Sequence, residues 1–447
     1  MPSDLQLKSN YSQILKLALP ICASLLVPQI NFITNLIFLG GLGEQVLAIA
    51  GITGVYYLIF SVIGHGLNSG LQTLISRRAG ENDPEKIGVL FQQGVLIALA
   101  ISAIAILFTL LVSPSIFGLL MVDTERLEMT NNFLAVRVWG LPFLLLYQLR
   151  NALLVGINKS NLLIAGTAVE TVVNIIFDYG FIYGNLGMPN LGYMGAAYAS
   201  IIAEFSGLVV IMLLINPPSI KNKVNLSLTW VPNKEIIIQI LSVSAPLILQ
   251  FIISVVAWEF FYLSMEHYGK RELAISSLMR TIFGFFGCFT WAFASAATAM
   301  ISNVIGQGKK EEVIPLTWKI TKLSLAFAFI MFVLLNIFPQ TFFAIFGQDS
   351  SFLEEAIPVV RMVSSALLFM AVGGIWVNAV VGTANTRITL LSEGIAIIFY
   401  CTFVFLAAEV YHLPVYIVWM SEWVYWSSLF LVSFIYLKKG NWRKKHI

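Results

Sequence analysis

The sequence predicts an all-α integral membrane protein with about twelve transmembrane helices, arranged as two pseudo-symmetric six-helix lobes around a central cavity. Composition is the first observation behind this prediction. Hydrophobic residues make up 58% of the 447 residues, charged residues make up 11%, and the mean hydropathy is +0.85. Soluble proteins carry about 25% charged residues, so this chain is suited to a lipid bilayer instead.

An internal repeat is the second observation. Residues 47–80 align without a gap to residues 273–306, and the identical positions include Gly80 and Gly306. The constant offset of 226 residues is close to half the chain. A repeat of this size in an apolar chain is typical of transporters built from two equivalent lobes around a central axis.

Apolar runs of about 20 residues, long enough to cross a bilayer, follow one another along the chain. In order, the expected spans are 14–40, 46–76, 86–118, 128–153, 160–184, 192–216, 236–267, 271–303, 315–346, 355–382, 387–410 and 413–437. The first is too long for the apolar core of a signal peptide, so we expect it to be retained.

The spans divide the chain into three parts. We expect an N-lobe at 1–216 with helices 1–6, a cytoplasmic inter-lobe linker at 217–235, and a C-lobe at 236–447 with helices 7–12. The C-lobe ends in a basic tail. With six spans in each half, both lobes start on the same side of the membrane and are parallel repeats.

The connections between spans alternate in basic content. Lys and Arg occur in one set, namely Arg77, Arg78, Arg150, Lys159, Lys221, Lys223, Lys234, Lys309, Lys310, Arg387 and the tail. The connections at 41–45, 184–190, 347–351 and 408–414 have none, and only Arg126 and the pair Lys270 and Arg271 break the alternation. By the positive-inside rule, both termini are cytoplasmic in a multi-pass protein of the cell (inner) membrane.

Several function classes lack their sequence signatures. The chain has no GxxxxGK[ST] phosphate loop, so we expect no ATP hydrolysis. Cys22, Cys288 and Cys401 lie in apolar stretches without CxxC spacing and are expected to pack as small core residues. We therefore expect no enzyme activity, cofactor, metal or nucleic-acid partner, and a monomeric secondary transporter acting on a small-molecule substrate within the lipid bilayer.

Three stretches resemble a known family. Residues 156–204 contain N-I-x-x-D-Y, a Gly-rich turn and L-G-x-x-G-A-A-x-A-[ST], which resemble the fifth and sixth helices of the multidrug and toxic compound extrusion (MATE) family. Residues 17–43 resemble its first helix, and residues 294–312 resemble the end of its eighth. The resemblance covers essentially the whole chain, and it implies cation-driven antiport of organic compounds with alternating access.

Polar residues within the spans are the candidates for ion coupling, because an ionised side chain at mid-bilayer costs roughly 2.5–3.5 kcal/mol on insertion scales. Glu170, Asn174 and Asp178 follow one stripe of the fifth helix, and Ser200 lies at a similar depth on the sixth. Their oxygens can bind sodium or share a proton. Alternatively, Asp178 belongs to a hydrogen-bond network that only holds the lobe together.

The resemblance implies that an aspartate on the first helix completes this site, and the motif match places Asn35 there. We favour a proton over sodium as the coupling ion, because Asn35 leaves fewer anionic ligands. Glu170 and Glu204 fall nearer the cytoplasmic side on neighbouring helices. If they are close, repulsion keeps one of them protonated as a proton carrier; alternatively, one faces a cytoplasm-open cavity and titrates normally.

The second lobe has its own candidates. Glu259 and Arg280 fall at similar depth on adjacent antiparallel helices and can form a functional or a static ion pair. Glu393 and Glu422 are expected to line the central cavity as cation-attracting groups. Pro20 on the first helix gives either a hinge or a fixed kink.

Two other functions fit parts of the pattern. A flippase for a lipid-linked saccharide precursor can share the two-lobed architecture, but it usually needs Arg and Lys to hold a pyrophosphate. A membrane enzyme acting on prenyl lipids needs a DDxxD motif or clustered histidines, and the chain has four histidines without such a motif. Because the intramembrane ionisable residues are mostly acidic, the sequence favours an antiporter that exports cationic or neutral amphipathic organic compounds by proton- or sodium-coupled exchange.

Overall fold

The computed structural model describes residues 5–221, 224–226, 231–340 and 350–444. Within them, twelve helices are long and apolar enough to cross a membrane, which confirms the predicted fold class. The first half contains α1 (Tyr11–Gly40), α2 (Glu44–Glu81), α3 (Pro84–Leu111), α4 (Ser113–Leu120), α5 (Thr124–Arg137), η1 (Val138–Gly140), α6 (Leu141–Gly156), α7 (Asn161–Tyr183), α8 (Tyr193–Ile215) and α9 (Pro218–Lys221). The second half contains α10 (Lys234–Tyr268), α11 (Lys270–Gly306), η2 (Lys310–Glu312), α12 (Val313–Ile337), α14 (Ser350–Gly382), α15 (Thr386–Val404), the π-helical η3 (Phe405–Val410), α16 (Val415–Val418), α17 (Ser421–Lys439) and η4 (Asn441–Lys444).

Prolines explain two places where a predicted span is interrupted. The expected span 86–118 ends early, because α3 stops at Leu111 and the separate helix α4 contains Pro114 in its first turn. Proline has no N–H to donate and disfavours helical backbone at the residue before it. Pro142 similarly follows the short 3-10 turn η1 inside the fourth span. The end of the expected span 315–346 lies outside the described residues.

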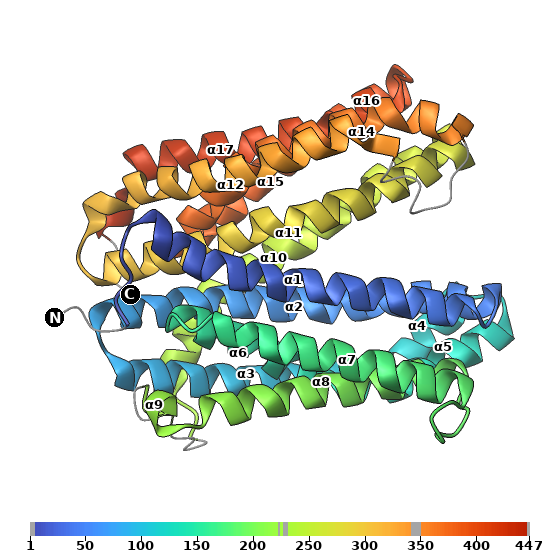
Figure 1. Ribbon diagram of the computed structural model, residues 1–447, viewed down its shortest axis with the longest axis horizontal. Helices are drawn as coiled ribbons and strands as arrows, with labels where there is room; N and C mark the ends of the chain where they lie inside the picture. The colour runs from blue at the N-terminus through green and yellow to red at the C-terminus, as the bar shows by residue number, and fades with distance from the viewer. Residues whose placement is uncertain (1–4, 222–223, 227–230, 341–349, 445–447) are drawn as a thin grey trace. The chain divides into compact units, whose positions relative to one another are not determined.

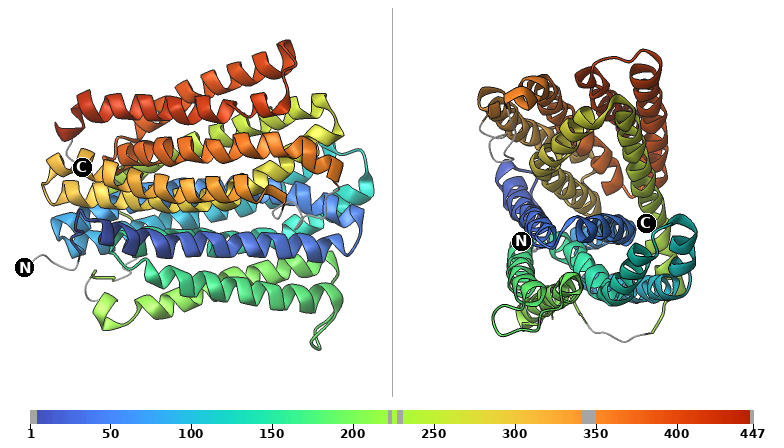
Figure 2. Two further views of the ribbon diagram at one scale, coloured as in Figure 1. Left: turned by 45° about the horizontal axis from the view of Figure 1, so that its top comes forward. Right: turned by 90° about the vertical axis from the view of Figure 1, so that its right-hand side faces the viewer.

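The chain forms two compact units. Residues 23–244 form one, here called the first unit, and residues 1–22 with 245–447 form the other, the second unit. Each is a bundle of helices that run up and down side by side (Figures 1 and 2). The division falls inside α1 and inside α10, whereas the lobe boundaries at 216 and 235 follow chain order and stay a prediction.

Equivalent helices occupy equivalent places in the two bundles. In the first unit, α6 packs against α2, α3 and α8, and α7 pairs with α8. In the second unit, α14 packs against α11, α12 and α17, and α15 pairs with α17. A helix that contacts several neighbours has little lipid-facing surface, so α6 and α14 form the interior of their bundles.

The internal repeat extends well beyond residues 47–80, because the turns repeat as well. Glu44 and Lys270 begin α2 and α11 at the same offset of 226 residues. Four pairs of residues at this offset have positive φ: Gly43 (109°) and Gly269 (131°), Asn82 (57°) and Gly308 (80°), Asn158 (61°) and Ala384 (63°), and Leu186 (57°) and His412 (48°). The turn conformation has therefore been kept even where the residue type changed, and at Gly43 and Gly269 the conformation favours glycine.

The chain segments before α1 and α10 are both held by side-chain amides. In the second unit, Asn303 accepts the N–H of Leu7 at 3.0 Å and donates to the carbonyl of Leu5 at 2.9 Å. In the first unit, Gln93 accepts the N–H of Asn233 at 2.9 Å and donates to the carbonyl of Val231 at 3.0 Å. Helices α1 and α10 thus each begin with an anchored segment in one unit and continue into the other.

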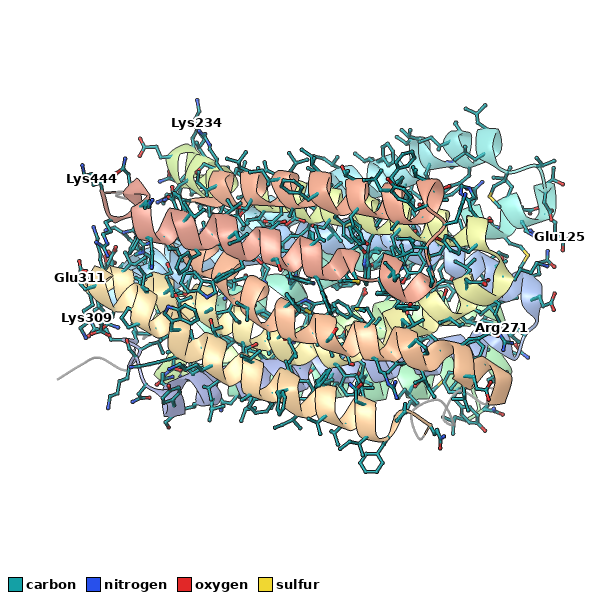
Figure 3. The ribbon with its side chains drawn as sticks, turned by 90° about the horizontal axis from the view of Figure 1, so that it is seen from above. Glu125, Lys234, Arg271, Lys309, Glu311 and Lys444 are labelled. Atoms are coloured by element: carbon teal, nitrogen blue, oxygen red, sulfur yellow. The ribbon has the colours of Figure 1, made fainter. Side chains whose placement is uncertain are left out.

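Charged residues mark the ends of each bundle (Figure 3). In the second unit, Lys309 and Lys444 lie at one end and Arg271 lies at the opposite end. In the first unit, Lys234 and Glu125 lie at opposite ends. Arg150, counted above among the loop charges, instead lies within α6 and is 1% exposed, so it does not contribute to the loop pattern.

A close approach of α14 to α17 makes Gly373 sensitive to substitution. A Cβ added there would overlap the backbone oxygen of Trp426, which cannot move aside as a side chain can. We expect Gly373→Ala to destabilise the protein by about 1–3 kcal/mol, as measured by unfolding in detergent. Gly284→Ala on α11 is the matched control, because nothing lies within 4 Å of its added Cβ. Equal stability of the two variants would contradict this packing.

Candidate ion-coupling site

Asn174 and Asp178 of α7 lie one helical turn apart in the first unit and are 1% and 0% exposed. No hydrogen-bond partner is found among the described residues for either carboxylate oxygen of Asp178, or for the amide nitrogen and oxygen of Asn174. A buried polar group without a partner costs about 1–3 kcal/mol, and a charged one costs more. Four such atoms on one stripe make Asn174 and Asp178 the main candidates for ion coupling.

Helix α1 contacts the C-terminal end of α7. The Tyr183 hydroxyl donates to the carbonyl of Phe38 at 2.8 Å, and Leu39 and Ile182 lie in one buried cluster. The two helices run in the same direction, because they are the first and fifth spans and successive spans reverse (Figure 1). Asn35 precedes Phe38 and Leu39 by about one helical turn on α1. It therefore lies at the level of residues 178–179 of α7, one turn before Ile182 and Tyr183.

Asn31 and Asn35 have the same spacing on α1 as Asn174 and Asp178 have on α7. The side-chain oxygens of Asn31 and Asn35 are also buried, again without a hydrogen-bond partner in the described part of the chain. The counted levels place Asn31 beside residues 174–175. Two stripes of unpartnered polar groups thus lie at the same two levels of neighbouring helices.

Ser200 of α8 falls at the level of this site. A Cβ added to Gly195 would come within 2.7 Å of the backbone of Phe181, and one added to Gly207 would come within 3.3 Å of the carbonyl of Gly166, so α7 and α8 approach closely at both glycines. Because α7 and α8 are antiparallel, these two approaches place Ser200 opposite residues 173–176, at the level of Asn174. The side chain of Ser200 is half-buried.

Arg137 holds Glu204 in a bidentate ion pair. Its Nη2 lies 2.5 Å from Oε1 of Glu204, its Nη1 lies 3.0 Å from Oε2, and Nη1 also donates to the Tyr57 hydroxyl at 2.8 Å. Gly140 leaves room for the pair, because an added Cβ would overlap both the guanidinium and the carboxylate. Glu204 therefore has a counter-charge, and the proton-carrying role of Glu170 or Glu204 stays a prediction.

Glu170 has a different environment. It interacts electrostatically with the buried guanidinium of Arg150, which stacks on the ring of Tyr147. The hydroxyl of Tyr147 lies within hydrogen-bonding reach of both Glu170 and Arg150. Glu170 thus belongs to a buried group with a positive charge and a phenol hydroxyl.

Glu393 of α15 accepts three hydrogen bonds in the second unit. Ser254 Oγ lies 2.6 Å from its Oε1, Tyr425 Oη lies 2.5 Å from the same oxygen, and Gln250 Nε2 lies 3.1 Å from Oε2. Glu393 is 0% exposed. The carboxylate therefore lies among α10, α15 and α17, covered by protein, rather than at an open surface.

Glu422 of α17 accepts two indole N–H groups. Trp258 Nε1 lies 3.2 Å from Oε1, and Trp426 Nε1 lies 3.0 Å from Oε2. Buried tryptophans usually find such an acceptor. At 4% exposed, Glu422 is also covered by protein, and the predicted role of Glu393 and Glu422 on a central cavity stays a prediction.

Glu259 and Arg280 lie together near the end of the bundle that carries Arg271. Arg280 Nη1 is 3.6 Å from Oε1 of Glu259, and the guanidinium lies 4.7 Å and 4.9 Å from the ring centroids of Trp258 and Tyr262. The side chains are 37% and 49% exposed. An exposed pair of this length contributes little stability, about 0–1 kcal/mol.

Sequence reasoning missed the partners of the buried acids. The sequence places Glu204 nearer the cytoplasmic side and indicates no partner for it, whereas the structure brings it into contact with Arg137. Gln250 and Tyr425 carried no signal, because neutral polar residues are common on transmembrane helices. The levels of Arg137 and Glu204 in the membrane can be counted from the turns at the ends of their helices. A long Arg side chain spans more than one helical turn, so it can bridge the difference in level that remains.

Metal-binding clusters are not evident in the described ranges, where no group of three His, Cys, Asp or Glu side chains comes together. Pro20 lies within the continuous helix α1, two residues before the boundary between the units at Cys22 and Ala23. Its role as a hinge stays a prediction.

The twelve spans in two repeated bundles, with buried polar sites inside them, define a multi-pass membrane transporter. The family model MatE matches residues 20–180 and again residues 246–406. The chain belongs to the MatE family, and it is a transporter rather than an enzyme. The two matches begin at Pro20 and Pro246, which are separated by the same offset as the internal repeat.

Curated relatives align over most of the chain. A probable multidrug resistance protein NorM of Thermotoga maritima is 22% identical over 449 residues, covering 97% of this chain and 94% of that protein. The multidrug export protein MepA of Staphylococcus aureus is 23% identical over 394 residues, covering 87% of this chain and 86% of that protein.

Solved structures share the fold. An outward-facing multidrug resistance MATE family transporter of the MOP superfamily superposes with a TM-score of 0.89 at 19% identity, over 98% of this chain and 97% of that one. A MOP superfamily transporter of Pyrococcus furiosus, described as having a binding pocket of reverse polarity, gives a TM-score of 0.87 at 19% identity, over 97% and 96%. At this identity, the likeness is one of fold.

Proposed function

We propose that this protein exports organic compounds by ion-coupled antiport with alternating access. The observation that carries the proposal is the group of Asp178, Asn174 and Asn35: the side-chain polar atoms of Asp178 and Asn174 and the side-chain oxygen of Asn35 are buried without a hydrogen-bond partner in the described part of the chain. A bare ionised carboxylate in such surroundings is unfavourable, and either a proton, which neutralises it, or a bound cation removes this cost. Binding of a proton or a cation therefore stabilises this site, which supports a role in ion exchange.

Asp178 is the proposed coupling residue, and Asn174, Asn35 and Ser200 supply neutral oxygens around it. Arg137 acts on Asp178 through space but is already engaged by Glu204, so it does not replace the ion. With one carboxylate and neutral amides, the site has a single negative charge to offer. A proton neutralises it completely, and we therefore favour a proton over sodium.

Coupling follows if the ion and the organic compound favour different conformations of the protein. An ion that binds one conformation more tightly shifts the equilibrium toward it, and by linkage the affinity for the compound changes by the same factor. Helices α1 and α10 belong to both units, so they are the elements that must deform when the units move. Pro20 is the proposed hinge of α1.

The proposed cargo is a cationic or neutral amphipathic organic compound. MepA is a multidrug export protein and NorM a probable multidrug resistance protein, which supports a drug-like cargo. We place the protein in the cell membrane as a monomer with both termini cytoplasmic, because its basic loops alternate as the positive-inside rule requires.

Proteoliposomes test the proposal directly. The purified protein is reconstituted with a fluorescent organic cation such as ethidium, and efflux is measured under an imposed pH gradient and, separately, under an imposed sodium gradient. We expect the pH gradient to drive efflux. Failure of both gradients to drive efflux would refute antiport of this cation, and movement of a lipid-linked pyrophosphate saccharide in the same vesicles would favour the flippase instead.

Replacement of Asn35 tests why a proton is favoured. Asn35→Asp adds a second carboxylate at the level of Asp178, which strengthens the binding of a cation that needs anionic oxygens. We expect the rate of sodium-driven efflux in the variant to be at least ~5-fold higher than in wild type. Asn336→Asp on α12, remote in sequence from the site, is the matched control. An equal gain in the control would remove Asn35 from the site.

A further inference from the structure

Helix α10 contains a proline at the place where it passes from the first unit to the second. Pro246 lies inside the helix, and the boundary between the units falls between Ser244 and Ala245. A proline inside a helix removes one backbone hydrogen bond and bends the helix. Pro246 lies 226 residues after Pro20, so the two helices that belong to both units carry their prolines at equivalent positions.

Glu393 is tied to α10 just beyond this proline. Gln250 and Ser254 lie four and eight residues after Pro246, one and two turns along the same face. They donate to the two carboxylate oxygens of Glu393 at 3.1 Å and 2.6 Å. Tyr425 of α17 donates the third hydrogen bond, so the position of α10 after its proline depends on one carboxylate.

Ser254 has two acceptors for a single proton. Its Oγ lies 2.6 Å from Oε1 of Glu393 and 2.9 Å from the backbone carbonyl of Gln250. When Glu393 is ionised, the hydroxyl donates to the carboxylate. When Glu393 takes up a proton, the new carboxyl O–H donates to Ser254 Oγ, and the hydroxyl turns to the carbonyl of Gln250. All protons are accounted for, and the hydrogen bond between α10 and α15 reverses its direction.

Glu393 faces no cation. Its hydrogen-bond donors are the neutral side chains named above. Among the described residues, Glu393 forms no ion pair with Lys, Arg or His. The titratable groups facing it are Tyr425 and, beyond that ring, Glu422, both on α17. The other charged residues of the packed elements lie at least one helical turn from this level. They include Glu259 on α10, Arg387 at the start of α15, Glu354, Glu355 and Arg361 near the start of α14, Glu409 in η3, and Lys438 and Lys439 at the end of α17.

Gln250 adds an open acceptor beside the carboxylate. Its side-chain oxygen is buried and has no hydrogen-bond partner among the residues that the structure describes, while its nitrogen donates to Glu393. The group of three helices therefore has a spare acceptor beside the carboxylate.

We propose that Glu393 is a second proton-carrying site and that its protonation state sets the bend of α10 at Pro246 through Gln250 and Ser254. Hydrogen bonds to an ionised carboxylate are roughly twice as strong as those between neutral groups, so deprotonation pulls α10 toward α15 and α17. Protonation weakens this attachment and releases the segment after the proline. The inference rests on the proposed function for its use in transport, but its test needs no transport.

The bend can be measured with two spin labels on α10. Ile238 and Leu263 lie on either side of Pro246 and are 54% and 60% exposed, so both sites accept a label. Labels are attached to cysteines at these two positions after replacement of the native cysteines, and the distance between them is measured by pulsed electron paramagnetic resonance in lipid nanodiscs. Measurements at mildly acidic and mildly alkaline pH, and with added sodium at constant pH, use no substrate.

We expect the distance distribution of wild type to shift with pH and not with sodium. The shift should disappear in Glu393→Gln and shrink in Ser254→Ala, which keeps the helix but removes the hydroxyl. Glu422→Gln is the matched control, a second buried carboxylate on a neighbouring helix, and it should keep the shift. Asp178→Asn should keep it too, which separates this inference from the proposed coupling site.

Four results would overturn the proposal. These are a shift that persists in Glu393→Gln, a wild-type distance that does not depend on pH, a shift driven by sodium at constant pH, and equal loss of the shift in Glu393→Gln and Glu422→Gln. Infrared difference spectra between the two pH values give a second readout. The signal of a protonated carboxyl group should be present in wild type and Ser254→Ala and reduced in Glu393→Gln.

Discussion

Asp178→Asn is expected to lower ion-driven efflux of the organic cation by at least ~10-fold, the size of a typical coupling between two sites. Asparagine has nearly the same shape as aspartate, so the packing of α7 is kept. The amide can neither take up a proton near neutral pH nor carry the negative charge that attracts a cation. The variant should still bind the cation, measured by fluorescence anisotropy, because the change removes the coupled ion and leaves the rest of the protein intact.

The control for this experiment is Glu259→Gln, which removes a carboxylate from an exposed ion pair with a distance of 3.6 Å. It should leave efflux within about 2-fold of wild type, because an exposed pair contributes little. Undiminished pH-driven efflux in Asp178→Asn would remove Asp178 from the mechanism. Loss of both efflux and cation binding would instead indicate that Asp178 only holds the first unit together.

The stripe on α7 could be predicted from the sequence because helical periodicity alone places Asn174 and Asp178 on one face. Asn35 is assigned to this site by the resemblance to the family and not by periodicity. Periodicity does not say which neighbouring helix a stripe faces or how that helix is rotated. The absence of hydrogen-bond partners for Asp178 within the described residues could therefore come only from the three-dimensional structure.

The partners of Glu204 and Glu393 show the same limit. Burial of a carboxylate requires compensation, but the compensating group can be an arginine, a hydroxyl or an indole, and each leaves a different sequence signal. An arginine is conspicuous among apolar residues, whereas Ser254 and Tyr425 are not. Two glutamates that look alike in sequence therefore have different chemistry, a fixed ion pair at Glu204 and neutral donors at Glu393.

The repeat predicted the fold more completely than it predicted the chemistry. The equivalent prolines and the paired positive-φ turns follow the 226-residue offset along most of the chain. At the same offset, Asp178 is matched by Val404 and Glu393 is matched by Thr167, so neither buried acid has an acidic counterpart. Backbone bends are thus shared by the two halves, while the groups that can hold an ion differ between them.

Arg137→Met tests whether the ion pair with Glu204 is structural. The substitution leaves Glu204, 5% exposed, as a buried charge without its partner. Removing one partner of a buried pair typically costs about 3–5 kcal/mol, so we expect a loss of stability in this range, measured by unfolding in detergent. Glu204→Leu alone should also be destabilising, because it leaves the guanidinium unpaired.

The double variant Arg137→Met with Glu204→Leu decides the interpretation. With both charges gone, no buried group is left unpaired, and stability should return to within about 1–2 kcal/mol of wild type. If the pair is only structural, the double variant should also retain pH-driven efflux, because Asp178 is untouched. Recovered stability without recovered efflux would mean that Arg137, which acts on Asp178 through space, helps to set the charge of the coupling site.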